Sequence, residues 1–135
     1  VHLDLMAGLP YDTLELLAHS FNVLYGIRPH HLQLGFLKLL PGTAMREQAE
    51  ALSIKFRTEP PYQVQQTPWI SSEELDMLHH IEGLVNSLFN SGHFPITLSE
   101  IENLYSNENY FHMYKSLALF WKSKKNLSLL YLLKI

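Results

Sequence analysis

Two short stretches of the chain combine a strand-like run with a Gly–Pro turn, and these turns are where ligand chemistry is expected. The first reads HLDLMAGLPYDT at residues 2–13, and the second reads LQLGFLKLLPGTAM at residues 32–45. In α/β proteins, ligands bind at the carboxyl ends of parallel strands. Glycine lets the backbone approach a flat ligand, and the start of the following helix offers free N–H groups. The alternative interpretation is that Gly and Pro serve only the geometry of the turns.

The other reactive side chains do not form a recognisable site. His30 and His31 are adjacent, as are His79 and His80, and neighbouring side chains diverge on a strand or a helix. The sequence has no cysteine and no HxxxH spacing, so the usual ligand patterns for zinc and for iron–sulfur clusters are missing from this chain. No serine lies in a GxSxG elbow. We therefore expect no metal site and no catalytic residue within these 135 residues.

The elements that would position the two turns form a strand–helix–strand–helix unit. Val1–Met6 reads as one strand, residues 12–25 as a helix, and His31–Leu40 as a second strand, after which Thr43 is the predicted cap of a second helix. Two strands joined by a crossover helix are parallel, and parallel sheets are covered on both faces. Two strands make too small a sheet, so we expect the chain to be the tail of a larger α/β protein.

Capping boxes are predicted at three helix starts. Asp12 is the expected cap of the first helix, with Glu15 completing a capping box and with Tyr11 and Leu16 as a hydrophobic staple. The same devices recur later, with Ser71 and Glu74 as one box and Thr97 and Glu100 as another. We expect the first helix to bury Leu14, Leu17, Phe21 and Leu24.

The chain divides into three segments on these patterns. Residues 1–52 hold the two strand–helix units, residues 53–70 read as an irregular connecting loop, and residues 71–135 read as a helical C-terminal region. A short extended stretch is predicted inside the loop at residues 62–64. The last helical stretch should run from about residue 107 to 122, and LSLLYLLKI continues it.

Charge and hydropathy exclude two classes of partner. The net charge of −3 and the pI near 6.2 give no basic surface for nucleic acid or for an anionic membrane. The sequence has no run of 18 apolar residues, and its first residues lack the pattern of a signal peptide. We expect a cytoplasmic protein that binds neither nucleic acid nor membrane.

The two turn motifs resemble a known family. HLDLMAGLPYDT is similar to the fifth-strand segment of radical S-adenosylmethionine (SAM) enzymes, and LQLGFLKLLPGTAM is similar to their sixth strand and its Pro–Gly–Thr exit. More narrowly, RPHHLQLGFLKLLPGT, PPYQVQQTPWIS and FNSGHF resemble the C-terminal region of cobalamin-binding radical SAM enzymes of the magnesium-protoporphyrin IX monomethyl ester oxidative cyclase type. The resemblance covers residues 1–94.

This resemblance implies an α/β fold that is mostly helical: a partial TIM-barrel fragment (βαβα with two parallel strands) followed by a helical C-terminal extension. In the family, a CxxxCxxC loop holds a [4Fe–4S] cluster that binds SAM, and a cobalamin domain often precedes the barrel. This chain would supply barrel units five and six. Asp12 stands where the family usually has Glu, which favours a capping role. The residues that the resemblance places at the cofactor are Met6, Ala7 and Gly8 on the adenine side and Phe36, Leu37, Lys38 and Leu39 at the adenine or the substrate.

Three functions are compatible with these patterns. The first is the C-terminal fragment of a radical SAM oxidoreductase or methyltransferase, which forms part of the SAM and substrate wall and is inactive alone. The second is a helical protein-interaction or regulatory module without a catalytic role, and a free-standing α/β regulatory domain is the third. The expected partners are the remainder of its own barrel, a cobalamin domain, a small-molecule substrate of unknown identity, and a second copy through the open sheet edge.

Overall fold

The N-terminal part of the chain forms a parallel two-stranded sheet. The computed structural model describes residues 1–105 and 108–133, with side chains described as far as Lys124. Strand β1 (His2–Ala7) pairs in parallel with β2 (His31–Phe36), in a register that runs from His2 opposite His31 to Ala7 opposite Phe36. Helix α1 (Leu14–Gly26) connects the two strands. The predicted α/β class, with a partial βαβα unit and a helical extension, is confirmed.

Only one face of this sheet is covered, which corrects the expectation of two covered faces. Leu3, Leu5 and Ala7 alternate along β1 with exposed residues, and the buried Leu32, Leu34 and Phe36 alternate along β2 with more accessible residues, of which Gln33 is exposed and His31 and Gly35 are half-buried. Because side chains on a strand alternate between faces, the six Leu, Ala and Phe residues share one face. That face joins the same hydrophobic core as the buried residues of α1 and α3 (Ser72–Val85). The two strands are therefore amphipathic.

The cap of helix α1 lies one residue later than predicted. Thr13 is its cap, and the Thr13 hydroxyl accepts a hydrogen bond from the backbone N–H of Leu16 at 3.2 Å. Tyr11 has a left-handed φ of 64°, and the N–H of Asp12 donates to the carbonyl of Leu9, so Asp12 belongs to the preceding turn. The predicted capping box and staple assume that Asp12 is the cap. They are wrong because Asp12 lies in the preceding turn and Thr13 caps the helix. The helix buries Leu17, Phe21 and Tyr25, while Leu14 and Leu24 are half-buried.

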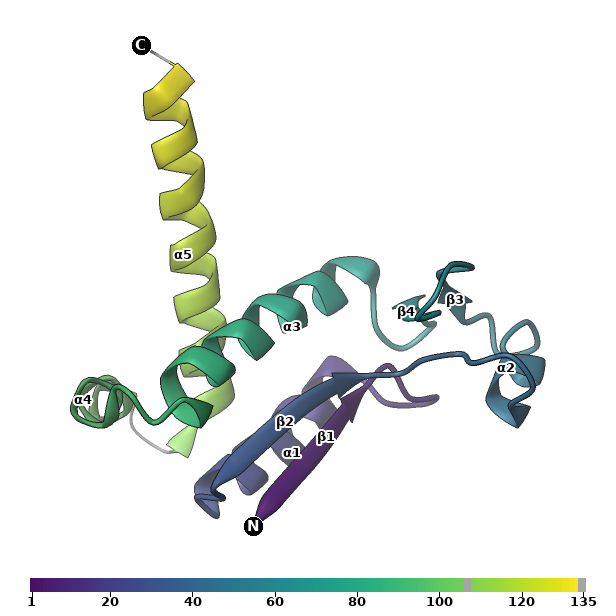
Figure 1. Cartoon of the computed structure of the whole chain (residues 1–135), viewed down its shortest axis with the longest axis horizontal. Helices are drawn as coiled ribbons and strands as arrows, with labels where there is room; N and C mark the ends of the chain where they lie inside the picture. The colour runs from purple at the N-terminus through teal and green to yellow at the C-terminus, as the bar shows by residue number, and fades with distance from the viewer. Residues whose placement is uncertain (106–107, 134–135) are drawn as a thin grey trace.

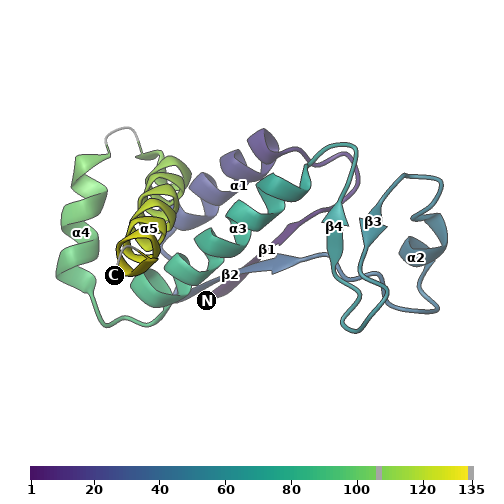
Figure 2. The ribbon, with the colours of Figure 1, turned by 90° about the horizontal axis from the view of Figure 1, so that it is seen from above.

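The segment predicted as an irregular loop contains a small antiparallel hairpin. After the short helix α2 (Ala44–Gln48), which Thr43 caps as predicted, β3 (Lys55–Phe56) pairs with β4 (Val64–Gln66). Figure 2 shows the hairpin and α2 together at the end of the molecule opposite α4 (Pro95–Leu104). The hairpin lies next to the carboxyl end of β2, because Lys38 forms an isolated antiparallel bridge with Gln63.

The C-terminal part is helical, as predicted. The capping box of Ser71 and Glu74 is present at α3, which continues into a π-helical turn, η1 (Asn86–Asn90). The second predicted box, of Thr97 and Glu100, is wrong. Proline fits the first turn of a helix without losing a needed N–H, and Pro95 begins α4 ahead of Thr97. 

Helix α5 (Tyr110–Leu133) is the longest element. It starts three residues after the predicted position and continues through most of LSLLYLLKI, whose last two residues lie outside the described part of the chain. Its first turns pack against α1 and α3, burying Met113, Tyr114 and Ala118, and the helix then extends away from the sheet (Figure 1). In residues 1–105 and 108–133, none of the helices combines the length and apolarity that crossing a membrane requires.

Candidate functional site

The uncovered face of the sheet is the first candidate site. It carries His2, Asp4 and Met6 from β1 beside His31, Gln33 and Gly35 from β2, and we call these six residues the open face. The rings of His2 and His31 lie 5.2 Å apart, and His31 Nε2 lies 3.4 Å from Gln33 Oε1. The sheet thus has a wall of polar and small side chains opposite its core face.

The carboxyl end of this face is apolar and is formed by Met6 and Gly35. Met6 is 43% exposed and lies opposite Gly35 in the register. A Cβ atom added at Gly35 would come no closer than 3.9 Å to the Met6 side chain or to the Leu5 carbonyl. A Cβ at this position would thus be in ordinary van der Waals contact with Met6, and its absence lets a flat ligand approach the strand backbone beside Met6.

The turn after β1 is buried by the hairpin. Gly8 has a φ of 92°, and a Cβ atom added there would lie 2.7 Å from Val64 Cγ1. Ala7 is fully buried, its carbonyl accepts a hydrogen bond from the N–H of Leu37, and the Leu37 carbonyl accepts one from the N–H of Val64. Ala7 and Gly8 therefore contact the protein core and the hairpin, and this close packing explains why both positions hold small residues.

The residues predicted at the end of β2 do not form one wall. Phe36 is buried and its ring stacks on His79 of α3 at 3.8 Å, and Leu39 is fully buried. Leu37 is half-buried and Lys38 is exposed. Among the seven predicted site residues, Met6 and Lys38 are thus the exposed ones.

The open face itself was missed by the sequence prediction. The alternation in HLDLMA and HLQLGF, with leucines at every second position, was the available signal for a face bearing His2, Asp4, His31 and Gln33. Among the described residues, no group of three or more His, Asp or Glu side chains is arranged to hold a metal ion. The side chains of His2, Asp4, His31 and Gln33 give the open face hydrogen-bonding groups.

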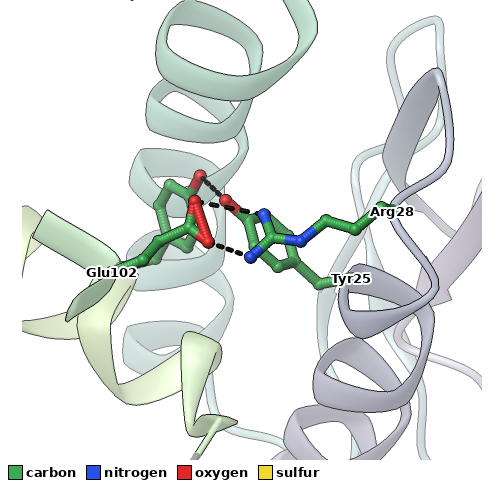
Figure 3. Close-up of polar contacts among 4 residues, drawn as sticks. Tyr25, Arg28 and Glu102 are labelled. Atoms are coloured by element: carbon green, nitrogen blue, oxygen red, sulfur yellow. Dashed lines mark hydrogen bonds and ion pairs between the residues drawn. The ribbon is translucent and has the colours of Figure 1, made fainter. Parts of the chain in front are cut away.

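A second polar cluster joins α1, α4 and α5 (Figure 3). Arg28, in the turn after α1, donates hydrogen bonds to both carboxylate oxygens of Glu102 on α4, with Nη1 and Oε1 3.1 Å apart. Its guanidinium lies 5.0 Å from the ring centre of Tyr25 and 5.2 Å from that of Tyr110. The bonds to Glu102 raise the pKa of Arg28. The ion pair holds α4 against the turn after α1.

The tyrosine hydroxyls behind this ion pair are not suited to acid–base chemistry. Tyr25 Oη and Tyr114 Oη lie 2.9 Å apart in the core. Burial raises the pKa of Tyr25 to about 12 and raises the pKa of Tyr114 as well. Both hydroxyls stay protonated near neutral pH. A cavity of about 550 Å³ lies beside the cluster, lined by Arg28, Glu102 and aromatic side chains including Phe89.

Comparison with known proteins gives one match. The model of the family described as "Protein of unknown function (DUF4080)" matches residues 50–130, which takes in the hairpin and most of the helical region. No curated protein and no solved structure matches the chain significantly. The β1–α1–β2 unit and its open face precede the matched residues.

Proposed function

The chain belongs to the DUF4080 family of proteins of unknown function, and from the resemblance of its two turn motifs we propose that it is the C-terminal part of a cobalamin-binding radical SAM enzyme. In this proposal the whole protein is an oxidoreductase or methyltransferase, similar to the oxidative cyclases of magnesium-protoporphyrin IX monomethyl ester. The chain contributes part of the wall around SAM and substrate, and the helices α3–α5 form a cap outside that wall.

One observation carries this proposal: the parallel pair β1–β2 is covered on one face only. In a barrel of parallel strands, alternate side chains point into the interior and toward the surrounding helices. Leu32, Leu34 and Phe36 pack under helices, while His31, Gln33 and Gly35 face away from them. The open face has the amphipathic pattern expected of two strands of a barrel wall. The family-like motifs stand at the carboxyl ends of these same strands.

The open face refines which residues would line the cofactor. Met6 of β1 and Gly35 of β2 lie at the carboxyl end of the open face, and Leu37 and Lys38 follow directly after β2, which ends at Phe36. Ala7, Gly8, Phe36 and Leu39 would support this wall from the core side. When bound, a [4Fe–4S] cluster would supply the electron for reductive cleavage of SAM, and its thiolates would come from another segment of the polypeptide, since this sequence has no cysteine.

The proposal is tested by filling the open face in the full-length protein. Gly35→Leu places a Cβ in ordinary contact, 3.9 Å from the side chain of Met6, and we expect the strand to tolerate it because Met6 is a flexible, exposed side chain that can shift. We expect 5′-deoxyadenosine formation to fall by at least about tenfold after anaerobic reduction with dithionite, because the leucine would displace the cofactor from its reactive position. The matched control is Gly83→Leu on α3, where an added Cβ has no neighbour within 4 Å.

Cluster content and folding are measured on the same samples. Absorbance and iron analysis should show equal cluster loading in the wild type and both variants. Wild-type rates of 5′-deoxyadenosine formation in folded, cluster-loaded Gly35→Leu would show that the open face does not line the cofactor.

The second candidate is a helical protein-interaction or regulatory module. Helix α5 favours it, because Leu119, Phe120 and Trp121 are 54%, 64% and 62% exposed, in contrast to the buried apolar face of α3. A groove of about 360 Å³ between α3 and α5 adjoins Leu119. A full-length protein that cleaves no SAM despite a reduced cluster would favour this second function.

A further inference from the structure

The two outer edges of the sheet are not equivalent. On the outer edge of β2, the side-chain amide of Asn90 pairs with the backbone of Leu32. The N–H of Leu32 donates to Asn90 Oδ1 at 2.9 Å, and Asn90 Nδ2 donates to the carbonyl of Leu32 at 2.8 Å. A primary amide has the same donor and acceptor as a peptide group. Asn90 therefore occupies both hydrogen-bonding groups that Leu32 would offer to a further strand.

The position of Asn90 is fixed by its own surroundings. It closes the turn η1, and its Nδ2 also donates to Asn86 Oδ1 at 2.8 Å, four residues earlier in the same turn. The turn continues directly from α3, whose Ile81 and Val85 are buried in the core. The amide is thus presented to β2 from a helix that packs on the core side of the same strand.

The side of β2 that faces β1 is also paired beyond the end of the strand, since the N–H of Leu37 donates to the carbonyl of Ala7. Beyond the strand, the carbonyl of Leu37 accepts from the N–H of Val64 at 2.9 Å, and the N–H of Leu39 donates to the carbonyl of Tyr62 at 2.8 Å. These bonds place residues 62–64 alongside the continuation of β2. Within the part of the chain that the structure describes, β1 has no neighbour except β2.

We propose that Asn90 is an edge-blocking residue that ends the sheet at β2, so that this edge does not accept a strand from a second copy of the chain. Leu32 is fully buried, so its backbone groups need these partners in the folded state. In a variant without Asn90, the N–H and the carbonyl of Leu32 would pair with a strand of another chain. The self-association expected of an open sheet edge is thereby restricted to β1. This inference does not depend on the proposed radical chemistry.

The test uses the 135-residue chain with two substitutions at Asn90. Asn90→Ala removes both bonds, whereas Asn90→Asp keeps the acceptor for the N–H of Leu32 and removes the donor to its carbonyl. The matched control is Asn103→Ala, an exposed asparagine on α4. Sedimentation velocity across a concentration series gives the weight-average mass, and circular dichroism gives the helix content.

We expect Asn90→Ala to reach at least twice the mass of the wild type at the highest concentration, with Asn90→Asp between the two and Asn103→Ala unchanged. Hydrogen exchange followed by mass spectrometry should also show the N–H of Leu32 exchanging about tenfold faster in dilute Asn90→Ala. A folded Asn90→Ala or Asn90→Asp with the mass distribution of the wild type at every concentration would overturn the proposal. If Asn90→Ala does not fold, the mass of Asn90→Asp decides.

Discussion

The contact between Gly8 and Val64 gives the most direct test of how the βα turn is built. Gly8→Ala places a Cβ atom 2.7 Å from Val64 Cγ1, at a residue whose φ is 92°. A residue with a Cβ in left-handed conformation costs about 1–2 kcal/mol. Overpacking against a side chain held in the core costs about 1–3 kcal/mol more. We expect the free energy of unfolding to fall by about 2–5 kcal/mol.

A double-mutant cycle separates the two contributions. Val64→Ala alone removes two buried methyl groups and should destabilise the chain by about 1–3 kcal/mol. Combined with Gly8→Ala, it also removes the atom that the new Cβ would strike, so only the backbone contribution of Gly8 should remain. The double variant should therefore be more stable than the sum of the two single changes predicts, by about 1–3 kcal/mol.

The assay is urea denaturation of the 135-residue chain, followed by circular dichroism and by tryptophan fluorescence. The ring of Trp69 lies 4.5 Å from that of Tyr11, a residue of this turn, so Trp69 adds a signal from the turn to that of Trp121 on α5. Additivity of the two changes within about 0.5 kcal/mol would refute the contact. The same contact means that a bulky residue at Gly8 would disturb the fold whether or not the turn touches a cofactor, so Gly35 is the better position for the functional test.

The remaining predictions concern the helix cap and the buried tyrosines. Thr13→Ala should destabilise the chain by about 1 kcal/mol through loss of the cap, and Asp12→Ala by clearly less; thermal melts that rank them the other way would return the cap to Asp12. Either Tyr25→Phe or Tyr114→Phe leaves one buried hydroxyl without its partner and should cost about 1–3 kcal/mol, while the double change should cost less than the sum. Because burial raises the pKa of Tyr25 from 10.0 to about 12, the folded state holds this proton more tightly than the unfolded state. This contribution to stability is complete below about pH 10 and is lost as the pH rises toward 12. Urea titrations at several alkaline pH values should show the free energy of unfolding of the wild type declining over this range. The decline should be weaker in the variant that carries both Tyr25→Phe and Tyr114→Phe.

The sequence alone determined the features that depend on neighbouring residues. The capping box of Ser71 and Glu74 and the cap at Thr43 join groups three residues apart, so short sequence patterns predict them. The parallel pairing of the two strands followed from their apolar content and the helix-length segment between them. The alternation in HLDLMA and HLQLGF also indicated that the sheet has one apolar face and one more polar face. The two stretches were instead interpreted as strands buried on both faces.

Only the tertiary structure decided how the candidate site is enclosed. The N–H of Leu32 and the amide of Asn90 are 58 residues apart, and Gly8 meets Val64 across the chain, so no local pattern contains either contact. The cap of α1 is Thr13 and not the predicted Asp12, because Tyr11 adopts a left-handed conformation in the preceding turn. Local propensity fixes which segments are strands and helices. The packing of hairpin, turn and helix against the strands then determines which glycine is buried and which side chains stay open to a ligand.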